Sequence, residues 1–291
     1  MKIDEDVLLI AGPTASGKTA LAIQAAQESD AIIINADSMQ VYSDLRIVSA
    51  RPSEDEEAKA PHFLFGHVDG AEAYSVARWL EDVRPFMTGS ARKRIFVGGT
   101  GLYFNSLLEG ISPVPEIDAK TREKWRVASQ LITAPELHKE LVRLDPDKAR
   151  TLRESDTQRV VRALEVIEST GRSLAEWQTE KGEAVLPSDM SIRKVLLMPD
   201  RAVLHQRINQ RFDMMLEAGA LDEVRQLLQR GLDPVLPVMK AIGVPQLLEV
   251  VNGETSLDEA CERAKAASRQ YAKRQSTWFR NSLGEGWELI S

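Results

Sequence analysis

One short segment, GPTASGKT from Gly12 to Thr19, constrains this chain more than any other. It matches the phosphate-loop pattern G-x-x-x-x-G-K-[ST], follows the apolar run VLLIA directly, and precedes a stretch, TALAIQAAQ, that is typical of a helix. In that setting backbone N–H groups and the helix N-terminus present partial positive charge to an anion. The segment therefore predicts a strand–loop–helix unit that binds a di- or triphosphate, with the Thr19 hydroxyl on a magnesium ion. The predicted binding residues are Gly12, Pro13, Thr14, Ala15, Ser16, Gly17, Lys18 and Thr19.

Three further apolar runs extend this unit into a sheet. They lie at 31–35, 94–101 and 193–198 and alternate with helical stretches. Short continuous apolar runs of this kind are typical of parallel strands buried on both faces. We therefore expect an α/β fold, with a P-loop-type parallel sheet core flanked by helices. Functional residues are then expected at the carboxyl ends of the strands.

The middle of the chain differs in character from both ends. Composition changes near Pro113 and Pro115, and from 117 to 185 the sequence is charged and helical, with no strand candidate. After 198 the pattern is again helical up to about residue 281. We predict a catalytic core from 1–116 and 186–291, with C-terminal helices, and an all-helical insertion domain at 117–185.

Composition limits where the protein works. No apolar run reaches the roughly 18 residues that a membrane helix needs. A single cysteine, Cys261, excludes an internal disulfide and any site built from several cysteines. We expect a cytoplasmic monomer with no membrane segment. The net charge of −7 gives no sign of nucleic-acid binding, but the run from Arg263 to Arg280 carries six basic residues and no acid.

Two polar residues follow predicted strands. Asp37 stands in NADSMQVY, directly after an apolar run, and Thr100 stands in VGGTGLY after another. Both should lie near the phosphate loop. Asp37 suits a magnesium ligand, a general base or a helix N-cap, and Thr100 suits either a site residue or a helix cap.

A pair of arginines gives a further candidate. Arg207 and Arg211, in HQRINQRFDMML, are four residues apart and share one helical face. Such a pair is usually a solvated surface, but beside a phosphate site it can hold a second phosphate.

Nine segments taken together resemble the tRNA dimethylallyltransferases, which modify the adenosine 3′ of the anticodon. They are GPTASGKT, NADSMQVY, APHFLFGHVD, YSVARW, VGGTGLY, QRVVRALEV, QRINQRFDMML, KAIG and RQYAKRQSTWFR, in that order. The resemblance implies transfer of the dimethylallyl group from dimethylallyl diphosphate to N6 of adenine, with Mg²⁺ as cofactor. It implies that the phosphate loop and Arg211 hold the diphosphate, that Asp37 is the general base, and that Thr100 also belongs to the catalytic set.

The resemblance also implies how tRNA is held. The helical insertion would clamp the anticodon stem-loop. Alternatively, Arg159 and Arg162 pair with Glu165 and Glu168 on their own helix and do not touch RNA. The implied tRNA contacts are Asp37, Ser38, Met39, Gln40, Thr100, Arg122, Gln158, Arg159, Val160, Val161, Arg162, Lys240, Ala241, Ile242, Gly243, Val244 and Pro245.

The sequence departs from the family pattern in places and leaves two rival functions open. Where the family often has D-I-G-T-A-K-P, this chain has RIVSARP from Arg46 to Pro52, and KAIGVP lacks an aromatic residue and a final basic one. These departures concern tRNA contacts. The chief rival is a nucleotide or small-molecule kinase, which needs an ATP base pocket and usually an arginine-rich lid. The other is a non-catalytic P-loop switch or RNA-binding module.

Overall fold

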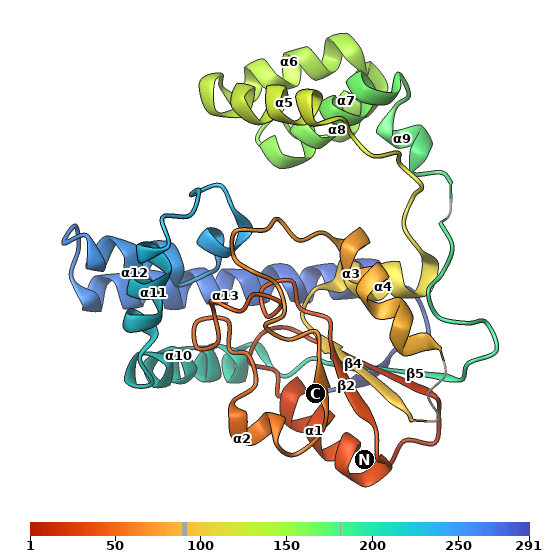
Figure 1. Cartoon of the computed structure of the whole chain (residues 1–291), viewed down its shortest axis with the longest axis vertical. Helices are drawn as coiled ribbons and strands as arrows, with labels where there is room; N and C mark the ends of the chain where they lie inside the picture. The colour runs from red at the N-terminus through yellow and green to blue at the C-terminus, as the bar shows by residue number, and fades with distance from the viewer. Residues whose placement is uncertain (89–91, 181) are drawn as a thin grey trace. The chain divides into compact units, whose positions relative to one another are not determined.

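The computed structural model of the chain describes residues 1–88, 92–180 and 182–291, and these fall into two compact units (Figure 1). The first unit comprises Met1–Leu108 and Val185–Ser291, and the second comprises Glu109–Ala184. The second unit thus starts at Glu109, where the sequence suggested 117. The reason is local: the backbone of Gly110 and Gly182 packs against Glu183 and Ile111, so the entering and leaving segments run against each other.

The first unit is built on a six-stranded sheet in which each neighbouring pair of strands is parallel. The strand order is β3-β2-β4-β1-β5-β6. The predicted strands are confirmed as β1 (Val7–Ala11), β2 (Ile32–Asn35), β4 (Arg94–Gly98) and β5 (Ile192–Leu197). Both edge strands, β3 (His62–Phe63) and β6 (Glu288–Ile290), are additions that the apolar pattern did not indicate.

Helices cover this sheet and extend beyond it (Figure 1). The long α13 packs on α10 and α12, and Cys261 is buried in α13. None of the helices among the described residues is both long and apolar enough to cross a membrane. The helices of this unit are α1 (Lys18–Ser29), α2 (Glu54–Glu57), α3 (Val76–Val83), α4 (Gly101–Glu109), α10 (Arg201–Glu217), α11 (Ala220–Gln229), α12 (Val244–Val251) and α13 (Leu257–Ser282), with 3₁₀ turns at Arg84–Met87 and Pro237–Lys240.

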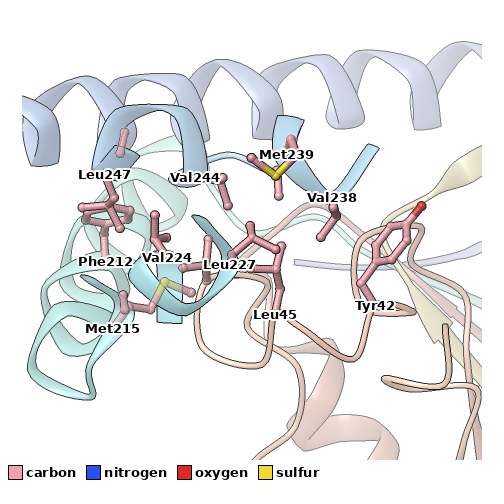
Figure 2. Packing of buried hydrophobic residues seen from close by; sticks show 14 of the residues in the cluster. Tyr42, Leu45, Phe212, Met215, Val224, Leu227, Val238, Met239, Val244 and Leu247 are labelled. Atoms are coloured by element: carbon pink, nitrogen blue, oxygen red, sulfur yellow. The ribbon is translucent and has the colours of Figure 1, made fainter. Parts of the chain in front are cut away.

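Hydrophobic clusters among the described residues hold the first unit together, and two of them involve α1 and α10. One joins the strands to α1. The other lies among α10, α11, α12 and α13 and the irregular chain after β2, and Figure 2 shows Phe212, Met215 and Leu45 within it. This second cluster is important for function, because it gives the irregular segment after β2 a fixed place beside α10.

The described residues of the second unit form helices and no strand. Its core gathers Trp125, Leu137, Leu141, Val160 and Leu164. Local signals fix its helix ends: Asp156 accepts a hydrogen bond from the Arg159 N–H at the start of α8, and Gly171 ends that helix with φ 68°. The helices are α5 (Ala119–Leu131), α6 (Ala134–Leu144), α7 (Pro146–Thr151), α8 (Thr157–Thr170) and α9 (Leu174–Trp177).

Candidate active site

The phosphate loop forms an open anion cradle at the carboxyl end of β1. Helix α1 begins at Lys18, and the preceding Gly17 has φ 96° and no side chain to cap the first turn. A helix N-terminus without a cap leaves its first N–H groups free for an anion. The Ser16 hydroxyl is buried beside them without a hydrogen-bond partner among the described residues. An anion in the loop would satisfy both sets of donors.

Two cations flank this cradle. Lys18 donates from Nζ to the Pro13 carbonyl at 2.8 Å, and the Arg211 guanidinium donates to the Thr14 hydroxyl. Neither forms an ion pair with a carboxylate in the described parts of the chain. Burial lowers the pKa of Lys18 to about 8, opposed by Asp37 and assisted by Arg211, and burial also lowers the pKa of Arg211. Partly buried charged groups that have no oppositely charged partner indicate a candidate anion-binding site.

The turn after β2 presents the Asp37 carboxylate. Asn35, at the end of the strand, accepts a hydrogen bond from the Asp37 N–H at 2.9 Å and donates to the Asp37 carbonyl at 2.9 Å. Asp37 Oδ1 accepts from the Met39 N–H at 3.0 Å. Oδ2 has no hydrogen-bond partner among residues 1–88, 92–180 and 182–291. No helix begins here, because α2 starts only at Glu54, so the helix-cap interpretation of Asp37 is wrong.

Thr100 braces this turn from the neighbouring strand. It stands between β4 and α4, and its Oγ1 accepts from the Ser38 N–H at 3.0 Å and contacts the Ser38 hydroxyl at 3.3 Å. Its side chain therefore bonds across the strands and does not cap α4. Thr100 is not part of the pocket lining described next. The structure thus places it behind Ser38.

The cradle and Asp37 open into one cavity of about 1090 Å³, which we call the central pocket. Its lining comes from the phosphate loop, residues 37–40, segment 46–51, α10, residues 240–242 and α13. Burial, and then the negative charge of Asp37, raises the pKa of Tyr271 on α13. Sequence reasoning did not place several lining residues here. These are Arg46, Ile47, Val48, Arg51, Phe65, Ser268, Tyr271 and Arg274.

The structure brings some of the predicted residues together and leaves others apart. Arg207 and Arg211 both line the central pocket, Arg207 being exposed. Val160 and Val244 are fully buried in hydrophobic clusters, where their side chains cannot reach RNA. Of the remaining predictions, Thr14 to Thr19, Asp37, Ser38, Met39, Gln40, Lys240, Ala241 and Ile242 line the pocket, whereas Arg122, Gln158, Arg159, Val161 and Arg162 belong to the second unit.

Gln275 on α13 bonds both the phosphate loop and the segment after β4, and sequence reasoning missed it. Its Oε1 accepts from the Thr14 N–H at 2.9 Å, and its Nε2 donates to the Gly99 carbonyl at 2.9 Å. Gly99 needs to be glycine, because a Cβ there would overlap the Gln275 amide and lie 3.1 Å from Asp37 Oδ2. A glutamine within a basic helix gives no sequence signal of this role.

We expect Gln275→Leu to destabilise the protein. The substitution keeps the side-chain bulk but removes the partner of the part-buried Thr14 N–H and of the buried Gly99 carbonyl, and the loss at the buried carbonyl alone costs about 1–3 kcal/mol. Urea unfolding measures the loss. As a control, Gln24→Leu removes an exposed glutamine that bonds only Glu28, and it should change stability little. Equal stabilities of the two variants would contradict the bracing role.

A phosphate loop at the carboxyl end of a parallel sheet, flanked by Lys18 and Arg211 and open to the central pocket, defines a P-loop-type fold. Family models agree: the "IPP transferase" model matches residues 40–282 and the "Isopentenyl transferase" model matches residues 5–62. The chain belongs to the tRNA dimethylallyltransferase family.

Individual relatives support this assignment. The chain is 54% identical to the tRNA dimethylallyltransferase of Chelativorans sp., covering 96% of this chain and 97% of that protein. It is 50% identical to that of Mesorhizobium japonicum, covering 98% and 89%. Among solved structures, a eukaryotic dimethylallyltransferase acting on tRNA matches with TM-score 0.80 and 30% identity over 99% of this chain and 74% of that one. The tRNA isopentenylpyrophosphate transferase of Bacillus halodurans matches with TM-score 0.67 and 33% identity over 98% and 90%.

Proposed function

We propose that this enzyme transfers the dimethylallyl group from dimethylallyl diphosphate to N6 of the adenosine 3′ of the anticodon in tRNA. One observation carries the proposal. A carboxylate oxygen without a hydrogen-bond partner, Asp37 Oδ2, belongs to the turn that lines the same pocket as an anion cradle flanked by Lys18 and Arg211. A base and a leaving-group site in one pocket are what a diphosphate-releasing alkylation of an amine requires.

The leaving group would be stabilised by the cradle. As the carbon–oxygen bond breaks, negative charge grows on the diphosphate oxygens. Lys18, Arg211 and the first N–H groups of α1 are already oriented there, so they need no reorganisation to stabilise it. The Arg211 bond to Thr14 fixes the guanidinium against the loop.

The nucleophile would be activated by Asp37. N6 of adenine is a weak nucleophile because its lone pair is delocalised into the ring. As the new carbon–nitrogen bond forms, one N6 proton passes to Asp37 Oδ2, which acts as general base. Asn35, Met39 and the Thr100–Ser38 contact hold the turn in place.

The residues present fit a magnesium ion of the kind that P-loop proteins hold. The Thr19 side chain lines the central pocket in the first turn of α1. No group of three or more His, Cys, Asp or Glu residues that could hold a metal occurs in the described parts of the chain. Magnesium is commonly held by one or two protein oxygens together with phosphate and water, so the Thr19 hydroxyl and the diphosphate would suffice. Bound there, the ion would supply further positive charge for the leaving group.

The base has to leave the anticodon stack to reach this pocket, and the pocket rim offers contacts for it. Ser38 and Gln40 line the pocket beside Asp37, and the exposed Lys240 lines it from another side. Lys240 forms no ion pair with a described carboxylate, so its charge is open to a phosphate.

The second unit supplies further cations. Arg122 is exposed and forms no ion pair with a described acid, whereas Arg159 pairs with Asp156 at 3.4 Å and Arg162 with Glu165 at 3.3 Å. Only the Arg162 pair matches the alternative that sequence reasoning left open. Exposed pairs of this kind contribute about 0–1 kcal/mol and exchange readily for a phosphate. We propose that Arg122, Arg159 and Arg162 contact the anticodon stem-loop.

Salt dependence tests this docking surface. We expect Arg159→Gln and Arg162→Gln each to weaken tRNA binding and to flatten the plot of log K against log salt by about 0.7–0.9. Affinity for dimethylallyl diphosphate should stay the same. The matched control is Arg143→Gln, since Arg143 is also an exposed arginine of this unit and pairs with Glu140. Unchanged slopes in both test variants would exclude α8 as the docking site.

The pH dependence of donor binding tests the role of Lys18. Because the pKa of Lys18 is lowered to about 8, this side chain loses its charge as pH rises through that value. Affinity for the diphosphate should therefore be full below pH 8 and fall above it. The profile of kcat/KM for the donor reports the free enzyme and measures this. In Lys18→Arg the fall in kcat/KM above pH 8 should disappear. A fall that persists in this variant would mean that another group titrates.

The reaction itself is tested by labelling. The enzyme is incubated with total tRNA and either labelled dimethylallyl diphosphate or γ-labelled ATP. Label that enters tRNA only from the first supports the proposal. Transfer of the ATP phosphate to an acceptor would favour a kinase, and binding without any transfer would favour a non-catalytic module.

A further inference from the structure

We propose that Glu223 is a positioning residue that sets the length of prenyl chain accepted by the central pocket. It would do so by holding residues 46–48 as one wall of that pocket. The inference rests on the proposed function, since it concerns the donor of the same reaction. It starts from a carboxylate on α11 that takes no direct part in the chemistry described above.

Glu223 binds three successive backbone N–H groups. Its Oε1 accepts from Arg46 at 2.7 Å and from Ile47 at 2.8 Å, and its Oε2 accepts from Val48 at 2.8 Å. Successive N–H groups that converge on one anion form a compact binding site for negative charge, and such charge-assisted bonds are strong. Glu223 forms no ion pair among the described residues. Within the described chain, both of its carboxylate oxygens accept hydrogen bonds from this segment alone.

The rest of the segment is fixed as well. Gln40 Nε2 donates to the carbonyls of Ser49 at 3.2 Å and Ala50 at 2.9 Å. The Arg46 guanidinium pairs with Glu57 at 3.0 Å. Residues 46–50 lie outside any helix or strand. The side chains of Gln40 and Glu223 therefore supply hydrogen bonds to this backbone in place of those of regular secondary structure.

This wall borders an apolar part of the pocket. Ile47 and Val48 line the pocket together with Phe212, Met215 and Ala241. Val48 is buried in the hydrophobic cluster of Figure 2, and a Cβ at position 243 would come within 3.1 Å of Val48 Cγ1. Packing from behind thus holds the Val48 side chain, whereas the backbone of the wall is held by Glu223.

The diphosphate site is next to this apolar lining. Phe212 directly follows Arg211 in α10, and Met215 lies one turn further on. A hydrocarbon chain attached to a diphosphate held by Arg211 is expected to lie along this lining, because burial of apolar surface is favourable. The position of residues 46–48 then decides how many carbons fit.

Replacing the carboxylate by an amide should release this wall. Glutamine has the same shape as glutamate, but its NH₂ group is a donor that faces backbone donors. At least one of the three N–H groups would lose its acceptor. The neighbouring Asp222 offers a matched control, because it is an exposed acid in the same helical turn whose side chain bonds only Arg225.

The experiment compares dimethylallyl diphosphate with geranyl diphosphate, which is longer by one five-carbon unit. The quantity measured is the ratio of kcat/KM for geranyl to that for dimethylallyl diphosphate, with an anticodon stem-loop as acceptor. We expect the ratio to rise about tenfold or more in Glu223→Gln, within the range by which apolar pockets discriminate chain length. It should stay at the wild-type value in Asp222→Asn.

An unchanged ratio in Glu223→Gln would overturn the proposal, even if both rates or the Tm fell. The reason is that loss of a purely structural role lowers kcat/KM for both donors by the same factor. If Glu223→Gln does not fold, Val48→Ala decides: it shortens the wall directly, and an unchanged ratio there would also overturn the proposal. Failure of the wild-type enzyme to use dimethylallyl diphosphate at all would instead contradict the proposed function.

Discussion

Asp37→Asn is expected to lower kcat by about 10²–10⁴-fold, the usual contribution of a positioned general base. Asparagine keeps the Oδ1 acceptor for the Met39 N–H, so the turn after β2 should persist. Only the ability of the second atom to take a proton is lost. Single-turnover transfer to an anticodon stem-loop measures the effect.

The donor should still bind to the Asp37→Asn enzyme, because the diphosphate cradle is built from other groups. Calorimetric titration with dimethylallyl diphosphate checks this point. Asp4→Asn removes an exposed carboxylate of the same unit and should leave kcat unchanged. Near-normal turnover in Asp37→Asn would remove Asp37 from the mechanism.

Arg211→Gln is expected to lower kcat/KM for the donor by about 10²–10³-fold. Removal of one oriented donor from a site of developing negative charge has this effect in other enzymes. Glutamine keeps part of the side-chain stem and an N–H donor but carries no charge, so the loss reports the guanidinium and its contact with Thr14. The measurement is initial rates at varied donor concentration.

Arg207→Gln provides the comparison for Arg211→Gln. Arg207 lies one turn earlier on the same helix and is exposed, whereas Arg211 is partly buried and contacts the phosphate loop. Replacement of Arg207 should therefore lower kcat/KM for the donor much less than replacement of Arg211. Equal losses in the two variants would mean that both arginines hold the diphosphate, and the assignment of Arg211 alone would be wrong.

Local patterns were sufficient to predict the centre of the fold. Strands β1, β2, β4 and β5 each contain a short run of apolar residues, and the phosphate loop has a fixed spacing. The edge strand β3 has two residues and β6 is exposed, so neither produces an apolar run. The chain from Ala36 to Ser53 is irregular and depends on side chains far away in sequence, which no local pattern reveals.

In the candidate site, too, local sequence patterns predicted some residues, whereas others depend on contacts with distant segments. The sequence pointed to Lys18 through the phosphate-loop spacing, to Asp37 through its place after a strand, and to Arg211 through the helical face that it shares with Arg207. Gln275 and Glu223 act through backbone atoms of distant segments, and their contacts exist only once α13 and α11 have packed. Their residue types carry no chemical signal, so only the three-dimensional arrangement identifies them.

The bond between Gln275 and Thr14 also has a consequence for biosynthesis. These residues are 261 positions apart, so the phosphate loop is synthesised long before the helix that bonds it. Contacts of such long range form late, because a large loop has to close before they can stabilise anything. A nascent chain that ends before α13 holds the phosphate loop with the Thr14 N–H unpaired. The order of synthesis therefore delays completion of the site around the phosphate loop until α13 has been made.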